Sequence, residues 1–126
     1  MDSRILEKLG YRVTVRTSSV KALELFRYKP DDFDLVITDM TMPNMLGDKL
    51  AVELMKIRPN IPVILCTGYS KKISDDSVTA IGIKAIAYKP ILKADLAKMA
   101  RKVLDEADEL IQPIGRKVIV GKNITT

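Results

Sequence analysis

The sequence predicts a three-layer α/β domain with a parallel β-sheet at its centre. Short apolar runs alternate with segments whose apolar residues recur at helical spacing, which is the pattern of α/β folds. Two of the runs, 35–38 and 61–66, are almost continuously apolar, as in parallel strands that are buried on both faces. The chain of 126 residues is long enough for one such domain with a substantial core.

The first part of the chain is expected to hold a helix, a strand and a second helix. Residues 2–9 form a short predicted helix that Gly10 stops. Residues 11–15 alternate apolar and polar side chains, which indicates a strand. Hydroxyl side chains at 17–19 can cap a helix over 20–27.

The middle of the chain contains the two buried strands and a helix between them. The strand over 35–38 is followed by a loop over 43–47 and by a helix over 48–57, in which apolar residues share one face. The strand over 61–66 contains Pro62, which a buried strand tolerates only near its start.

The last part of the chain alternates in the same way. A weak helical pattern covers 74–81, a strand is expected over 83–88, and the strongest helical pattern covers 93–110. Proline and glycine at 112–115 break that helix. A final strand is expected over 116–120.

The composition excludes several kinds of function. The chain has no histidine, so it cannot use histidine as a general base, nucleophile partner or metal ligand. Its one cysteine, Cys66, lies in an apolar run, which excludes a disulfide framework and favours the cytoplasm. No apolar run approaches the roughly 20 residues of a membrane span. The net charge of +5 is scattered and aromatic residues are 5%, which favours a solvated basic surface over nucleic-acid binding.

Three polar residues follow three successive predicted strands. Asp39, Thr67 and Lys89 each stand at the end of an apolar run. Because the carboxyl ends of parallel strands meet at one edge of the sheet, we expect a shared crevice there. The acidic residues Asp31, Asp32 and Asp34 instead precede their strand and are expected at the opposite edge, in solvent.

A carboxylate, a hydroxyl and an ammonium are the groups that a phosphoryl-accepting aspartate requires. The carboxylate is the nucleophile, and the cation and the hydroxyl neutralise charge on the phosphoryl oxygens. Each residue also has a structural interpretation: Asp39 as a loop cap, Thr67 as a turn residue, and Lys89 as a solvated lysine before a proline.

The motifs around these residues resemble the receiver domain of two-component response regulators, of the chemotaxis-regulator type. They are the string Asp39-Met40-Thr41-Met42-Pro43 with Gly47, the pair Thr67-Gly68 and the triplet Tyr88-Lys89-Pro90. The resemblance covers residues 10–109. It implies a flavodoxin-like, doubly wound sheet of five parallel strands in the order 2-1-3-4-5.

The resemblance also implies roles for individual residues. Asp39 would be the phosphoacceptor, with Thr67 and Lys89 contacting the phosphoryl group. Thr67 and Tyr88 would form the switch, although a structural role for the Tyr88 ring is equally compatible with the sequence. Mg²⁺ is the cofactor of the family, and its ligands here would be Asp39 and the backbone carbonyl of Thr41. Pro43, Gly47 and Pro90 would shape loops.

The start of the chain departs from the family pattern. Receivers open with a central strand that ends in an acidic pair, and this chain opens within the helix that follows. We hypothesise that Lys117–Val120 fills the vacant central position, either in the same chain or in a strand-swapped dimer. The alternative is a disordered or edge-packed tail. Gly121 and Lys122 would then replace the acidic pair, which predicts a poor affinity for Mg²⁺. The expected domain boundaries are 1–111 for the receiver and 112–126 for the tail.

The function expected from these features is that of a bacterial phosphorelay receiver. It would accept a phosphoryl group from a histidine kinase or phosphotransfer protein on Asp39 and switch a partner-binding face. It would be a phosphoprotein module rather than an enzyme, and could be a fragment of a hybrid histidine kinase. The alternative is a degenerate receiver that binds a partner without phosphorylation. An unrelated small α/β enzyme or nucleotide binder has little support, because no glycine-rich phosphate loop is present.

Overall fold

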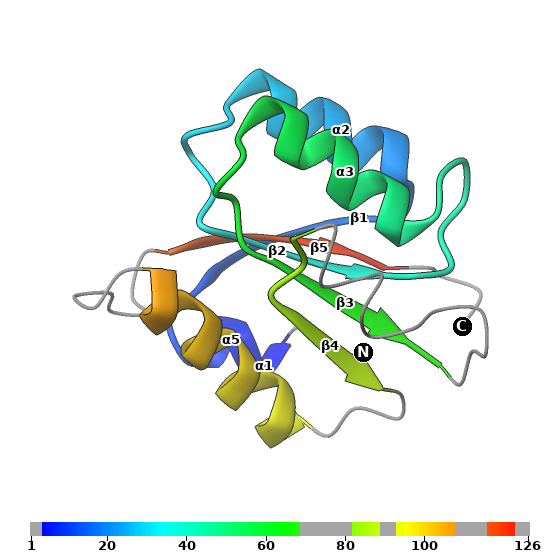
Figure 1. The fold of residues 1–126 in the computed structure, drawn as a ribbon. Coiled ribbons are helices and arrows are strands. Elements are labelled where there is room, and N and C mark those ends of the chain that lie inside the picture. The colour runs from blue at the N-terminus through cyan, green and yellow to red at the C-terminus, as the bar shows by residue number, and fades with distance from the viewer. Residues whose placement is uncertain (1–3, 69–81, 89–92, 108–115, 123–126) are drawn as a thin grey trace.

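The computed structural model describes residues 4–68, 82–88, 93–107 and 116–122 (Figure 1). The predicted helix over 74–81, and the predicted site residues Lys89 and Pro90, lie outside these ranges. The described elements are α1 (Arg4–Lys8), β1 (Arg12–Arg16), α2 (Ser19–Tyr28), β2 (Leu35–Asp39), α3 (Gly47–Ile57), β3 (Val63–Thr67), β4 (Ala85–Tyr88), α5 (Lys93–Ala107) and β5 (Lys117–Gly121).

The five strands form one parallel sheet in the order β1-β5-β2-β3-β4. The last strand of the chain therefore lies between the first two. β5 pairs with β1 from Arg12↔Lys117 to Arg16↔Gly121, and with β2 from Leu35↔Val118 to Thr38↔Gly121. The prediction that Lys117–Val120 occupies the central position is confirmed, and the disordered-tail alternative is wrong for these residues. Because the pairing is within one chain, a swapped dimer stays a prediction.

Helices cover both faces of the sheet. Figure 1 shows α2 and α3 on one face and α1 and α5 on the other. β5 contributes to the core on each side, because its side chains alternate between the two faces. Val118 and Val120 pack into the core under α1 and α5, while Ile119 packs into the core under α2 and α3. All three side chains are fully buried, as expected for a central parallel strand.

Two helix ends follow from local sequence signals. Ser18 is the N-cap of α2, and its Oγ accepts a hydrogen bond from the backbone N–H of Lys21 at 3.5 Å. Gly10 follows α1 with a φ of 101°, a left-handed conformation that glycine adopts without steric cost. Both agree with the sequence prediction.

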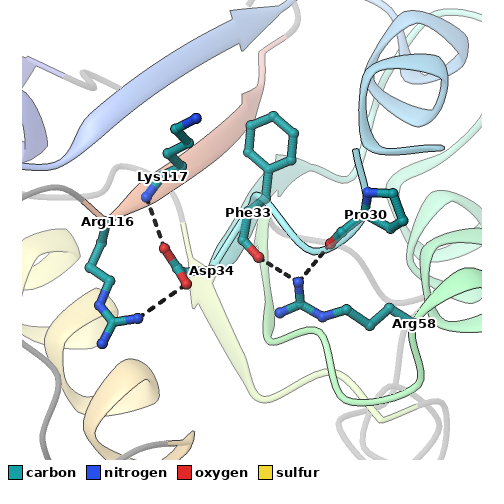
Figure 2. A network of polar contacts seen from close by, with 6 residues as sticks. All are labelled: Pro30, Phe33, Asp34, Arg58, Arg116 and Lys117. Atoms are coloured by element: carbon teal, nitrogen blue, oxygen red, sulfur yellow. Dashed lines mark hydrogen bonds and ion pairs between the residues drawn. The ribbon is translucent and has the colours of Figure 1, made fainter. Parts of the chain in front are cut away.

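A polar network fixes the start of β5 against the segment that precedes β2 (Figure 2). The Asp34 carboxylate accepts hydrogen bonds from the backbone N–H of Lys117 at 3.0 Å and from the Arg116 guanidinium at 3.2 Å. The Lys117 ammonium also lies 2.6 Å from the Asp32 carboxylate, and this hydrogen bond lowers the pKa of Asp32. Asp31 is exposed at this edge, as predicted, but Asp32 and Asp34 are only partly exposed, because β5 brings two basic side chains that pair with them.

A second part of the same network holds the turn before β2 (Figure 2). The Arg58 guanidinium, from the end of α3, donates hydrogen bonds to the carbonyls of Pro30 and Phe33, each at 2.6 Å.

Within the described residues, none of the helices is long and apolar enough to cross a membrane.

Candidate functional site

The carboxyl ends of the strands bring most of the predicted site residues to one edge of the sheet. Asp39 is the last residue of β2, Thr67 of β3 and Tyr88 of β4. Asp39 pairs with Cys66, and the N–H of Met40 donates to the carbonyl of Cys66 at 2.7 Å. Asp39 and Thr67 therefore lie on adjacent strands one register step apart. Lys89 directly follows β4 but is outside the described residues.

The Asp39 side chain is enclosed by the protein. Only 1% of the residue is exposed, although it ends a strand at the edge where ligands bind in this class of fold. Its Oδ1 atom receives no hydrogen bond from the described part of the chain, while the residue makes other interactions. A carboxylate buried at a strand end keeps one orientation, which suits a nucleophile.

The loop after Asp39 is held closely against the strand end. The N–H of Gly47 donates to the carbonyl of Met40 at 2.7 Å. A Cβ at Gly47 would collide with the backbone carbonyl of Asp39 and would lie 2.8 Å from Cδ1 of Leu65. Gly47 is the first residue of α3 rather than part of the predicted loop, and its lack of a side chain allows this helix to begin beside Asp39.

The same loop is tied to the start of α2 by two side-chain hydrogen bonds. Nδ2 of Asn44 donates to Oγ of Ser18 at 2.8 Å, and Oγ of Ser19 donates to the carbonyl of Met45 at 2.7 Å. Asn44 has a φ of 75°, a left-handed conformation that asparagine tolerates better than most residues. Sequence reasoning identified Ser18 only as a helix cap and missed this contact. Asn44 directly after Pro43 was the available signal, because both favour turns.

The two predicted switch residues, Thr67 and Tyr88, differ in how far they are exposed to solvent. Thr67 is buried, and its hydroxyl donates to the carbonyl of Gly68 at 3.0 Å. Tyr88 is 56% exposed and lies in a groove between β4 and α5. The groove is also lined by Lys84, Met99 and Asp95, so it combines apolar surface with charges of both signs.

The residues at the end of β5 do not fit a magnesium site. Mg²⁺ prefers an octahedral set of oxygen ligands and usually binds one or two carboxylates. The described residues contain no group of three acidic, histidine or cysteine side chains that could hold a metal. Gly121 contributes no side chain, and a Cβ there would lie 2.7 Å from Oγ1 of Thr38. The next residue is Lys122, a cation, so Asp39 and the carbonyl of Thr41 remain as the evident ligands.

Known proteins with similar sequences are sensor kinases and response regulators of two-component systems. The family model for the response regulator receiver domain matches residues 2–101. The chain is similar to the sensor kinase CckA of Brucella abortus, with 31% identity over 83% of this chain and 11% of that protein. It is also similar to the two-component response regulator ARR10 of Arabidopsis thaliana, with 37% identity over 94% of this chain and 19% of that protein. The chain thus spans less than a fifth of either relative.

Solved structures share the fold. A response regulator receiver domain protein from Clostridium thermocellum has a TM-score of 0.75 and 30% identity, over 86% of each chain. The receiver domain of NtrX from Brucella abortus has a TM-score of 0.73 over 82% of this chain and 86% of that one. Its identity is 22%, so this second likeness concerns the fold alone.

Proposed function

Because the chain belongs to the response regulator receiver domain family, we propose that it accepts a phosphoryl group from a histidine kinase or phosphotransfer protein on Asp39. Receivers of two-component systems, including those in hybrid kinases, generally bind Mg²⁺ and interact with such donors. The observation that carries the proposal is the burial of Asp39 at the carboxyl end of β2, one register step from Thr67.

The proposed step is an in-line phosphoryl transfer. A carboxylate oxygen of Asp39 forms a bond to phosphorus while the phosphorus–nitrogen bond of the donor phosphohistidine breaks. The bonding electron pair returns to the imidazole nitrogen, which takes up a proton from solvent. The product is an acyl phosphate on Asp39 and a neutral histidine on the donor. The chain is thus the substrate of a kinase and is not itself proposed to be an enzyme.

Thr67 is proposed to contact the new phosphoryl group. Its hydroxyl now donates to the carbonyl of Gly68, and a rotation about χ1 would turn the same donor toward a phosphoryl oxygen. The Lys89 ammonium is proposed to neutralise the remaining charge. A change around Thr67 would reach Tyr88, because these two residues pair between β3 and β4. The partner-binding face would then be the groove between β4 and α5.

One observation favours a second function. Lys122 and Gly121 stand where a receiver normally carries its acidic pair, which supports a degenerate receiver that binds partners without phosphorylation. The two functions differ in whether Asp39 forms an acyl phosphate. The groove beside Tyr88 would serve as a binding face in either case.

A mass measurement distinguishes the two functions. We expect the chain, incubated with phosphoramidate, to gain the mass of one phosphoryl group and to lose it in hydroxylamine, which cleaves acyl phosphates. The Asp39→Asn variant should gain nothing, while Asp31→Asn, an exposed carboxylate at the opposite edge, should behave like the unmodified sequence. The proposal fails if no adduct forms with phosphoramidate and none forms with a phosphorylated histidine kinase.

A further inference from the structure

Lys122 directly follows β5, and the register of β5 with β2 points it toward the candidate phosphoacceptor. In the pairing of β2 with β5, Ile37 lies opposite Val120 and Thr38 lies opposite Gly121. One more step in the same register brings Lys122 opposite Asp39. The backbone of Lys122 is held there, because its N–H donates to the carbonyl of Arg16 in β1 at 2.9 Å.

The alternation of side chains also predicts that Lys122 and Asp39 point to the same face of the sheet. Side chains alternate along a strand, so residues two apart point to the same side. In β5, Val118 and Val120 belong to the core under α1 and α5, and in β2 the same core contains Leu35 and Ile37. Continuing each series by two residues gives Lys122 and Asp39.

The separation of the two residues suits an ionic contact through a bound anion. Neighbouring strands are about 4.8 Å apart, and a lysine side chain is long enough to cross that gap. Lys122 is half-buried, and within the described part of the chain its ammonium makes no ion pair. It is therefore available to an oxyanion bound next to Asp39.

A lysine at this position lowers the affinity of the site for a divalent cation. Magnesium sites use carboxylates to offset the two positive charges of the ion, and a lysine in their place adds a third positive charge. Gly121 supplies no carboxylate to offset this charge, and a side chain at this position would collide with Thr38. The same ammonium can neutralise charge on phosphoryl oxygens, which is the electrostatic role that phosphoryl transfer requires.

We propose that the Lys122 ammonium replaces the divalent cation at this site, so that Asp39 accepts or binds a phosphoryl oxyanion without metal. The inference rests on the proposed function of Asp39, and its test contains one measurement that does not depend on phosphorylation. In the phosphorylation reaction with phosphoramidate, an oxygen–phosphorus bond forms on Asp39, the phosphorus–nitrogen bond breaks, and ammonia leaves with a proton from solvent.

The first measurement follows metal binding by line broadening of backbone amide NMR signals with Mn²⁺, a paramagnetic substitute for Mg²⁺. We expect the amides of Asp39, Met40 and Thr67 to stay sharp in the unmodified chain at millimolar Mn²⁺. The Lys122→Asp variant places a second carboxylate beside Asp39, and it should bind Mn²⁺ at least tenfold more tightly. The spectra also report whether each variant is folded. Equal broadening in both proteins overturns the proposal.

The second measurement is the rate of adduct formation with phosphoramidate, in EDTA and in Mg²⁺. The unmodified chain should react at rates within twofold in the two solutions. The Lys122→Gln variant, which loses the charge and keeps most of the length, should react at least tenfold more slowly in EDTA. Lys8→Gln, an exposed lysine at the end of α1, serves as the matched control and should react normally.

The outcomes distinguish the role of Lys122 from the role of Asp39 as phosphoacceptor. A rate that rises at least tenfold with Mg²⁺, or a Lys122→Gln variant as fast as the unmodified chain, overturns the role of Lys122 while Asp39 remains a phosphoacceptor. If no protein forms an adduct in either solution, and a phosphorylated histidine kinase gives none either, the proposed function fails, and the Mn²⁺ measurement alone then supports or overturns the exclusion of divalent cations by Lys122.

Discussion

Gly121 in β5 lies opposite Thr38 in β2, and a Cβ at Gly121 would stand 2.7 Å from Oγ1 of Thr38. The C-terminal strand thus ends in close contact with the residue before Asp39. We expect Gly121→Ala to destabilise the protein by about 1–3 kcal/mol, the usual cost of overpacking a core. Gly68→Ala is the control, because a Cβ there has no neighbour within 4 Å, and it should change stability by less than about 0.5 kcal/mol. Urea unfolding measures both, and equal effects would contradict the contact.

Ile119 tests whether β5 is a central strand in solution. Its side chain is fully buried in the core under α2 and α3, so Ile119→Ala should cost about 2–5 kcal/mol in the free energy of unfolding. Val15→Ala on the edge strand β1, where the side chain is 38% exposed, should cost less than about 1 kcal/mol. Chemical denaturation at several protein concentrations measures the difference. Similar small costs would mean that β5 leaves the sheet in solution.

Asp34 links the start of β5 to the start of β2. Asp34→Ala removes the acceptor of the Lys117 N–H and the ion pair with Arg116, so we expect a loss of about 1–3 kcal/mol in stability. Asp31→Ala removes an exposed carboxylate of the same turn and should cost less than about 0.5 kcal/mol. Thermal unfolding compares the two variants. An Asp34→Ala protein as stable as Asp31→Ala would show that the network does not hold β5.

The pKa of Asp32 gives a dependence on pH with a defined sign. Its hydrogen bond with the Lys117 ammonium lowers the pKa below the ordinary value of 3.8. A lowered pKa means that the ionised form favours folding, so this contribution is complete above the ordinary pKa and is lost as the pH falls through the lowered one. Asp32→Asn should therefore be less stable than the unmodified chain at pH 6, and the difference should shrink below about pH 4. Unfolding curves from pH 2 to 7 test this, and a gap that widens in acid would contradict it.

Asn44 holds the loop after Asp39 through its backbone and its side chain. Asn44→Gly keeps access to the left-handed φ of 75° and loses only the hydrogen bond to Ser18. Asn44→Ala loses both, so we expect it to be the less stable variant by about 1 kcal/mol, because left-handed backbone is costly for alanine. Thermal unfolding measures the two side by side. The opposite ranking would contradict the role of the backbone, because both variants lose the side-chain hydrogen bond and differ only in their access to a left-handed φ.

Much of the site could be predicted because it depends on the ends of strands. The apolar runs before Asp39 and Thr67 identify both strands, and parallel strands bring their carboxyl ends to one edge wherever they stand in the sheet. The contact of Asn44 with Ser18 could not be predicted, since the two residues are 26 positions apart and meet only when α2 packs beside α3. The pairing of Asp32 and Asp34 with basic residues was missed for the same reason, as Arg116 and Lys117 arrive from the far end of the chain.

The sequence by itself determined the α/β class, the buried strands, and Asp39 and Thr67 as neighbours, because periodicity and strand ends are local properties of the chain. It also suggested that Lys117–Val120 could fill the central position, and left a disordered tail as an alternative. Only the tertiary structure decided between them. Val118, Ile119 and Val120 bury completely between β1 and β2, which satisfies their backbone hydrogen bonds on both sides and joins the two cores. That placement also pairs Gly121 with Thr38, the residue before Asp39, a relationship that depends on strand register rather than on sequence distance.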